Sequence, residues 1–155
     1  MQFINYFLAS LISYSGLLIG VMLIKIAPEE QKSGQKYFIS LGKALLLIIF
    51  ILAVFYYKGI LSYFFILIMM FLILLLAEFK KWGLFKKSAV TYSLLGILFF
   101  LSSKNADLFI AESSLILLYG LPIASLIYSR KEINHYKIFL YNLGFIALSN
   151  ILFFI

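Results

Sequence analysis

Six long apolar runs, separated by short clusters of charged or turn-forming residues, make up almost the whole 155-residue chain. Each run has about 18 residues or more, enough for a helix to cross a hydrocarbon core of about 30 Å at 1.5 Å per residue. The pattern therefore predicts an all-α fold, a polytopic transmembrane helical bundle that forms a single integral membrane domain over residues 1–155. The predicted spans are residues 3–26, 37–57, 60–79, 84–102, 108–129 and 138–155.

The lengths of the connections predict how the spans pair. The second connection is little more than Lys58 and Gly59, and the fourth runs only from Ser103 to Asp107, whereas the first and fifth connections are longer. Because consecutive elements are usually neighbours in space, we expect three antiparallel hairpins. An even number of spans also places both termini on the same side of a membrane.

The basic residues are distributed very unequally between the two sides. Eleven of the thirteen Lys and Arg residues lie in or beside the first, third and fifth connections, and only Lys58 and Lys104 lie on the other side. The positive-inside rule then predicts cytoplasmic basic loops and both termini outside. The net charge of +7 is explained by this topology and by contact with anionic lipid headgroups at the cytoplasmic face, so no nucleic-acid partner is predicted.

Composition argues against catalysis and against bound metals. The chain is 65% hydrophobic, has no cysteine and has a single histidine, His135. The six acidic residues are scattered, and no nucleophile, paired-carboxylate or metal-ligand motif is present. We therefore expect an integral membrane protein that is not an enzyme, with no catalytic residue, no cofactor and no metal site.

Small and polar residues follow one face of the first span. Asn5, Ala9, Ser13, Gly16 and Gly20 are separated by steps of three or four residues. Membrane helices gain little from burying leucine against leucine instead of lipid, so small residues that let backbones approach are a principal source of packing energy. This face is expected to contact the fifth or sixth span, with a ligand groove as the open alternative. The candidate helix-packing residues are Gly16, Gly20, Gly120 and Ala124.

Similar faces occur in the fourth, fifth and sixth spans, so these three and the first span are expected at the centre of the bundle. The third span has almost no small residue between Ser62 and Ala77. It is therefore expected at the periphery, against lipid or another subunit.

The fifth span contains the most unusual polar features. Pro122 removes a backbone hydrogen bond, so a kink or local unwinding is expected near residues 118–120. Glu112 lies four residues into the span, about 6 Å from its start, and is interpreted either as a first-turn carboxylate that reaches the interface or as part of a path. The candidate polar path consists of Glu112, Ser113, Ser114, Pro122 and Asn142.

The longest polar passage, APEEQKSGQKYF, follows the first span. Pro28 and the two acids after it suit the first turn of a short interfacial helix. The simplest interpretation of the passage is a solvated bend, and the alternative is a docking surface. Together with the other basic bends it forms a candidate surface for lipid headgroups or a protein partner. Its residues are Glu29, Glu30, Lys80, Lys81, Lys86, Lys87, Arg130 and Lys131.

Two functions remain open at the level of the sequence. The first is a membrane scaffold or accessory subunit, which needs only lipid-compatible packing faces and a homo-oligomeric or membrane-protein partner. The second is a small-solute or ion transporter or channel that uses the polar path near Glu112 and a helix break at Pro122. No ionisable residue falls at the middle of a predicted span, which favours the scaffold.

Overall fold

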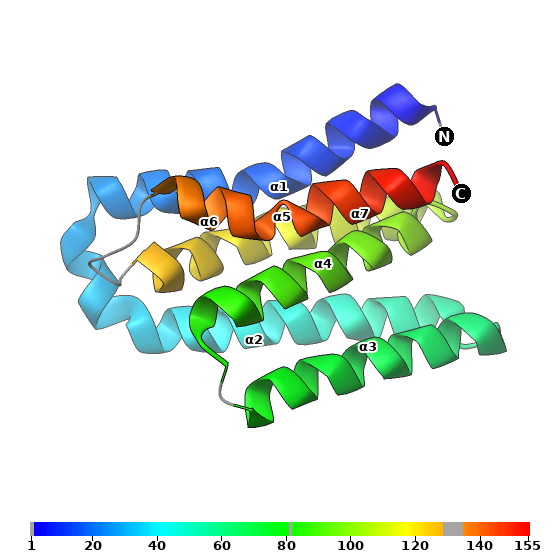
Figure 1. Cartoon of the computed structure of the whole chain (residues 1–155), viewed down its shortest axis with the longest axis horizontal. Helices are drawn as coiled ribbons and strands as arrows, with labels where there is room; N and C mark the ends of the chain where they lie inside the picture. Colours follow the sequence, from blue (N-terminus) through cyan, green and yellow to red (C-terminus); the bar gives the residue numbers. More distant parts are fainter. Residues whose placement is uncertain (1, 81, 129–134) are drawn as a thin grey trace.

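The computed structural model describes residues 2–80, 82–128 and 135–155. In these residues the chain is helical nearly throughout and has no strand. Seven helices follow one another: α1 (Phe3–Ile26), α2 (Pro28–Tyr57), α3 (Leu61–Phe79), α4 (Leu84–Ser102), α5 (Ala106–Tyr128), α6 (His135–Asn142) and α7 (Gly144–Phe153). Figure 1 shows them as a bundle with both termini at one end.

Six helical stretches are long and apolar enough to cross a membrane, which confirms the predicted fold class at this level. They are Phe3–Ile26, Ser33–Tyr57, Leu61–Phe79, Leu84–Ser102, Ala106–Tyr128 and Tyr136–Phe153. The first and fourth predicted spans have the same bounds, and the others differ by a few residues at their ends.

The polar passage after the first span is helical from Pro28 onward, as expected for a helix begun by this proline, and its described residues are mostly exposed. Only Ala27 separates α1 from α2, and Pro28 occupies the first turn of α2, where its missing N–H costs no hydrogen bond. At 1.5 Å per residue, the 30 residues of α2 extend over about 45 Å and the 19 of α3 over about 28 Å. The first turns of α2 therefore extend past the end of α3 (Figure 1).

The last membrane-length stretch is interrupted at Leu143, which separates α6 from α7. Next to this break, Gly144 packs directly on the hydroxyl of Ser93 in α4, where a larger side chain would collide. The interruption thus lies next to a close contact with α4.

The centre of the bundle is formed by α4 and α5, which are the most buried spans, with α1 along α5. The helix α3 contacts mainly α2 and is among the least buried, which confirms its predicted peripheral place. The last span has the same low share of buried residues, so its predicted central place is wrong. It packs mainly on α4 and also contacts α1, with Phe145 and Ser149 buried in these contacts.

The small residues of α1 and α5 face each other along one seam. A Cβ added to Gly120 would lie 2.5 Å from the carbonyl carbon of Gly16, and one added to Gly20 would lie 2.7 Å from the Cβ of Ala124. Real Cβ atoms essentially never approach so closely, so these positions exclude larger residues. The structure therefore brings the four candidate packing residues together in two pairs, one helical turn apart.

Two tyrosines connect α1 to the last span. The hydroxyl of Tyr6 donates a 2.9 Å hydrogen bond to the carbonyl oxygen of Ser149, and that of Tyr14 donates a 2.6 Å hydrogen bond to the carbonyl oxygen of Phe139. Both rings are buried. The ends of the described chain are thus held together through buried side chains as well as through α4 and α5.

Candidate functional site

A cavity of about 440 Å³ lies between α2, α3, α4 and α5. This volume falls within the range of small-molecule pockets, about 300–1,000 Å³. Most of its wall is aliphatic or aromatic, from all four helices. The wall includes Leu46 and Phe50 of α2, Phe71 and Leu74 of α3, Leu84 of α4, and Ile123 and Ile127 of α5.

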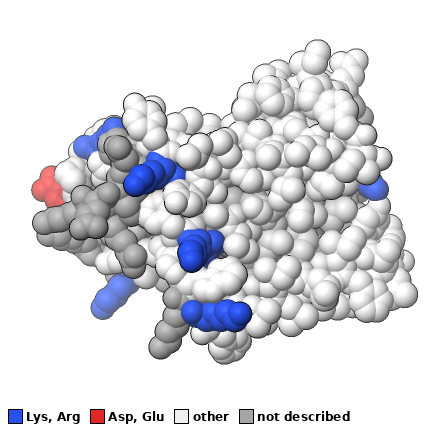
Figure 2. Space-filling view, in the orientation of Figure 1, with Lys and Arg blue, Asp and Glu red and all other residues white. Residues whose placement is uncertain are grey.

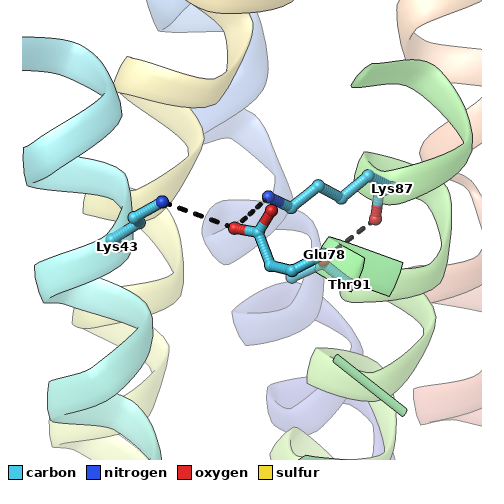
Figure 3. Close-up of polar contacts among 4 residues, drawn as sticks. All are labelled: Lys43, Glu78, Lys87 and Thr91. Atoms are coloured by element: carbon cyan, nitrogen blue, oxygen red, sulfur yellow. Dashed lines mark hydrogen bonds and ion pairs between the residues drawn. The ribbon is translucent and has the colours of Figure 1, made fainter. Parts of the chain in front are cut away.

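Three charged side chains stand at one end of this cavity. Glu78, next to the end of α3, lies between Lys43 of α2 and Lys87 in the first turn of α4. A single carboxylate oxygen, Oε1 of Glu78, is 2.5 Å from Nζ of Lys87 and 3.5 Å from Nζ of Lys43. Figure 3 shows the two ammonium groups converging on this carboxylate from neighbouring helices. We call these three residues the charged triad; with two positive charges and one negative charge it has a net charge of +1.

Two other polar side chains on the wall are engaged by the protein itself. The hydroxyl of Thr91 donates a 2.9 Å hydrogen bond to the carbonyl oxygen of Lys87, and that of Ser88 donates a 2.6 Å hydrogen bond to Oδ1 of Asn142. Both residues are buried. The charged triad supplies the charged side chains of the wall, which also includes Tyr119.

The cavity communicates with the lateral surface of the bundle. Its wall includes Ile39 and Leu47 of α2 and Phe71 of α3, whose exposed fractions are 41%, 56% and 49%. These side chains are apolar and lie in membrane-length helices. The lateral opening of the cavity is therefore lined by apolar side chains.

The predicted polar path is not assembled. Ser113 and Ser114 donate hydrogen bonds to carbonyl oxygens of their own helix, those of Phe109 and Ile110. Asn142 contacts Ser88 near the beginning of α4, whereas Glu112 lies beside Ser102 at its end. Fourteen residues separate these two positions of α4, about 21 Å along the helix. The cavity wall includes none of the five path residues.

Glu112 does not reach the interface, so that interpretation of its position is wrong. Its side chain is fully buried, with an exposed fraction of 0%, and neither carboxylate oxygen makes a hydrogen bond of normal geometry. The hydroxyl of its neighbour Ser102 donates instead to the carbonyl oxygen of Phe99 at 2.8 Å. Distance along the chain from the start of a helix does not reveal such burial, because neighbouring helix ends cover the residue.

Pro122 lies inside a continuous helix, so of the predicted kink or local unwinding near residues 118–120 the structure excludes the unwinding. The helix α5 extends without interruption from Ala106 to Tyr128, and Pro122 is buried. The close contact of Gly120 with Gly16 holds the adjacent turn against α1. Neighbouring helices commonly stabilise proline inside membrane helices in this way.

The predicted headgroup or partner surface is only partly described. Glu29, Lys80 and Lys86 are exposed, and Lys87 belongs to the charged triad. Lys81, Arg130 and Lys131 lie outside the described residues, and so does the side chain of Glu30. Figure 2 shows Lys and Arg gathered over the part of the bundle with the α1–α2 bend and the α3–α4 connection, with one basic group at the opposite end.

Sequence reasoning missed Lys43 and Glu78 as members of a site, although a signal was present. Lys43 precedes the end of α2 by 14 residues, and Glu78 follows the beginning of α3 by 17. In two antiparallel consecutive helices these positions lie at nearly the same depth, within about one turn. Opposite charges at matching depth in consecutive spans predict an ion pair.

Comparison of the chain with protein-family models, with curated protein sequences and with solved structures gives no match. The site is therefore interpreted from its own residues.

Proposed function

We propose that this chain is an integral membrane protein of the scaffold or accessory type that holds the hydrocarbon chain of a membrane amphiphile between α2, α3, α4 and α5. The observation that carries the proposal is the cavity itself, with apolar walls and charged groups at one end. An amphiphile has the same division into a long apolar part and a polar end. Burial of each methylene group contributes about 0.8 kcal/mol when it leaves water, and less when it leaves lipid.

The proposed topology is three hairpins with both termini outside and the basic connections in the cytoplasm. The inequality of Lys and Arg between the two sides supports this orientation. The charged triad would then stand at the level of the cytoplasmic headgroups, because Glu78 and Lys87 lie beside the α3–α4 connection. Anionic lipid at that face is the proposed environment of the basic residues.

Transport is the weaker alternative. A path through the bundle needs polar groups that converge, and the path residues lie at different levels or bond within their own helices. The seam of α1 and α5 offers no space, since glycines occupy it at backbone contact. An accessory role requires neither convergence nor an opening.

The cavity can be tested by filling it. Gly42 belongs to its wall, and a Cβ there would meet Cδ1 of Ile123 at 3.4 Å, so the side chain of Gly42→Leu would project into the cavity. The purified protein in nanodiscs would be irradiated with a fatty acid carrying a photoreactive group on its chain, and the labelled peptides mapped by mass spectrometry. We expect labelling of the facing surfaces of α2 to α5 in the wild type and its loss in Gly42→Leu.

Gly59→Leu is the matched control, because a Cβ at Gly59 has nothing within 4 Å. Its labelling should equal that of the wild type. A second filling variant, Leu74→Trp on α3, guards against misfolding of Gly42→Leu, and only variants that melt like the wild type are compared. Uniform labelling of all outer helix surfaces, unchanged in both filling variants, would refute the proposal. Ion flux into liposomes that Glu112→Gln abolishes would establish the transport alternative instead.

A further inference from the structure

The charged triad has a feature that a purely structural ion pair does not require. Two ammonium groups share one oxygen of a single carboxylate, so one positive charge remains uncompensated among these three groups. The side chains of Lys43, Glu78 and Lys87 have exposed fractions of 66%, 46% and 29%, so all three are accessible from outside the bundle. Another anion could therefore take the place of Glu78 beside the two lysines without unfolding of the bundle.

The position of the triad connects it to the cavity. All three residues belong to the cavity wall, and they stand at the end where α3 stops and α4 begins. From this end the wall continues as apolar side chains of α2, α3 and α5. A molecule with a hydrocarbon chain among these side chains would hold its polar end at Lys43 and Lys87.

The two converging ammonium groups of Lys43 and Lys87 favour a ligand whose polar end is an anion. A phosphate monoester carries a charge of about −1.5 to −2 near neutral pH and has three strong acceptor oxygens. It could accept hydrogen bonds from two lysines on different oxygens, whereas Glu78 offers both of them the same one. Phosphate thus matches the two converging ammonium groups better than the carboxylate does.

We propose that the cavity selects an amphiphile with an anionic phosphate headgroup, which Lys43 and Lys87 bind and for which Glu78 is the intramolecular competitor. This rests on the proposed function, because the chain of the amphiphile occupies the apolar part of the same cavity. The headgroup replaces Glu78 between the two lysines. Removing the carboxylate should therefore strengthen binding of the phosphate, and removing either lysine should weaken it.

The experiment measures lipid binding to the full chain by native mass spectrometry from detergent micelles. The probes are dioleoyl phosphatidic acid, dioleoyl phosphatidylcholine and dioleoylglycerol. The variants are Lys43→Gln, Lys87→Gln and Glu78→Gln, with Lys86→Gln as the matched control because Lys86 is exposed and lies outside the cavity wall. Inorganic phosphate is added in a separate arm as a competitor without a hydrocarbon chain.

We expect phosphatidic acid to bind best, and each cavity lysine variant to weaken it about fivefold, the effect of about 1 kcal/mol per basic residue near an anionic lipid surface. Glu78→Gln should strengthen its binding, and Lys86→Gln should leave it unchanged. Dioleoylglycerol should bind the wild type and all four variants equally. Phosphate alone should compete only weakly.

Each of the following results would overturn a particular part of the proposal. If phosphatidic acid and dioleoylglycerol bind equally and Gly42→Leu abolishes the binding of both, the cavity holds the hydrocarbon chain but the lysines do not select the headgroup. If Glu78→Gln weakens binding of phosphatidic acid while melting like the wild type, Glu78 supports the site and does not compete. If inorganic phosphate displaces phosphatidic acid completely, the triad binds a free anion. If no lipid responds to Gly42→Leu, the proposed function itself fails.

Discussion

Gly16 of α1 and Gly120 of α5 pack backbone against backbone: a Cβ at Gly120 would lie 2.5 Å from the carbonyl carbon of Gly16 and 2.6 Å from the backbone nitrogen of Leu17. Nothing flexible separates the two helices at this point. The contact therefore sets the distance between α1 and α5, and through α5 the position of the helices that enclose the cavity.

Gly16→Leu and Gly120→Leu should each destabilise the protein. Overpacking usually costs about 1–3 kcal/mol, and here the obstacle is backbone, which cannot rotate away as a side chain can. The measurement is the melting temperature in detergent, followed by size-exclusion chromatography of heated samples. Gly59→Leu, at a position with open space, should melt like the wild type. Equal melting of all four proteins would show that the seam is loose.

The seam between α1 and α5 shows which parts of the helix packing can be predicted from the sequence. Gly16 and Gly20 on one helix, and Gly120 and Ala124 on another, are each four residues apart, so the face that each helix presents is predictable. The register between the two helices is not, because any two small-residue faces can meet. That pairing depends on the packing of all the helices at once.

The cavity and the burial of Glu112 could not be predicted from the periodicity of apolar residues. The volume between α2, α3, α4 and α5 depends on how far apart whole helices stand, and the apolar residues of the wall are of the same types as those on the outside of the bundle. The apolar residues of α2 give no sign of which ones line a cavity. Likewise, Glu112 lies near the start of α5 in the sequence yet is fully buried. Residue patterns predict faces, and burial depends on what covers them.

Tyr57→Phe should loosen the end of the bundle near both termini. The buried hydroxyl of Tyr57 in α2 donates a 2.5 Å hydrogen bond to the carbonyl oxygen of Leu101 in α4. Phenylalanine keeps the ring and removes only the donor, so we expect a loss of about 1 kcal/mol, measured as a lower melting temperature. The adjacent Tyr56 is 42% exposed, and Tyr56→Phe serves as the control that should leave melting unchanged. Identical effects of the two variants would contradict the role of the Tyr57 hydroxyl.

Ser88 and Asn142 should be energetically coupled. The hydroxyl of Ser88 donates to Oδ1 of Asn142 at 2.6 Å between α4 and α6, and the amide of Asn142 donates to the carbonyl oxygen of Ile138. In a double-mutant cycle with Ser88→Ala and Asn142→Ala, we expect a coupling energy of about 0.6 kcal/mol, the average for such bonds in membrane proteins. Unfolding in detergent with increasing denaturant supplies the free energies.

The same cycle with Ser113→Ala in place of Ser88→Ala should give no coupling, because Ser113 bonds to Phe109 within its own helix. Additive effects of Ser88→Ala and Asn142→Ala would mean that the two side chains do not stabilise each other. Any stabilising contact of the Asn142 side chain would then be made with residues other than Ser88.

Glu112 should be replaceable without loss of stability. Its carboxylate is fully buried and makes no hydrogen bond of normal geometry, and a buried polar group without such bonds costs about 1–3 kcal/mol. Methionine has a similar unbranched shape and fills irregular spaces, so Glu112→Met should raise the free energy of unfolding, and Glu112→Gln should change it little. Glu29→Gln, at an exposed position, controls for the loss of one negative charge. A marked loss of stability in Glu112→Met, with wild-type stability in Glu112→Gln, would instead assign a stabilising polar contact to this side chain, with Ser102 as the first partner to test.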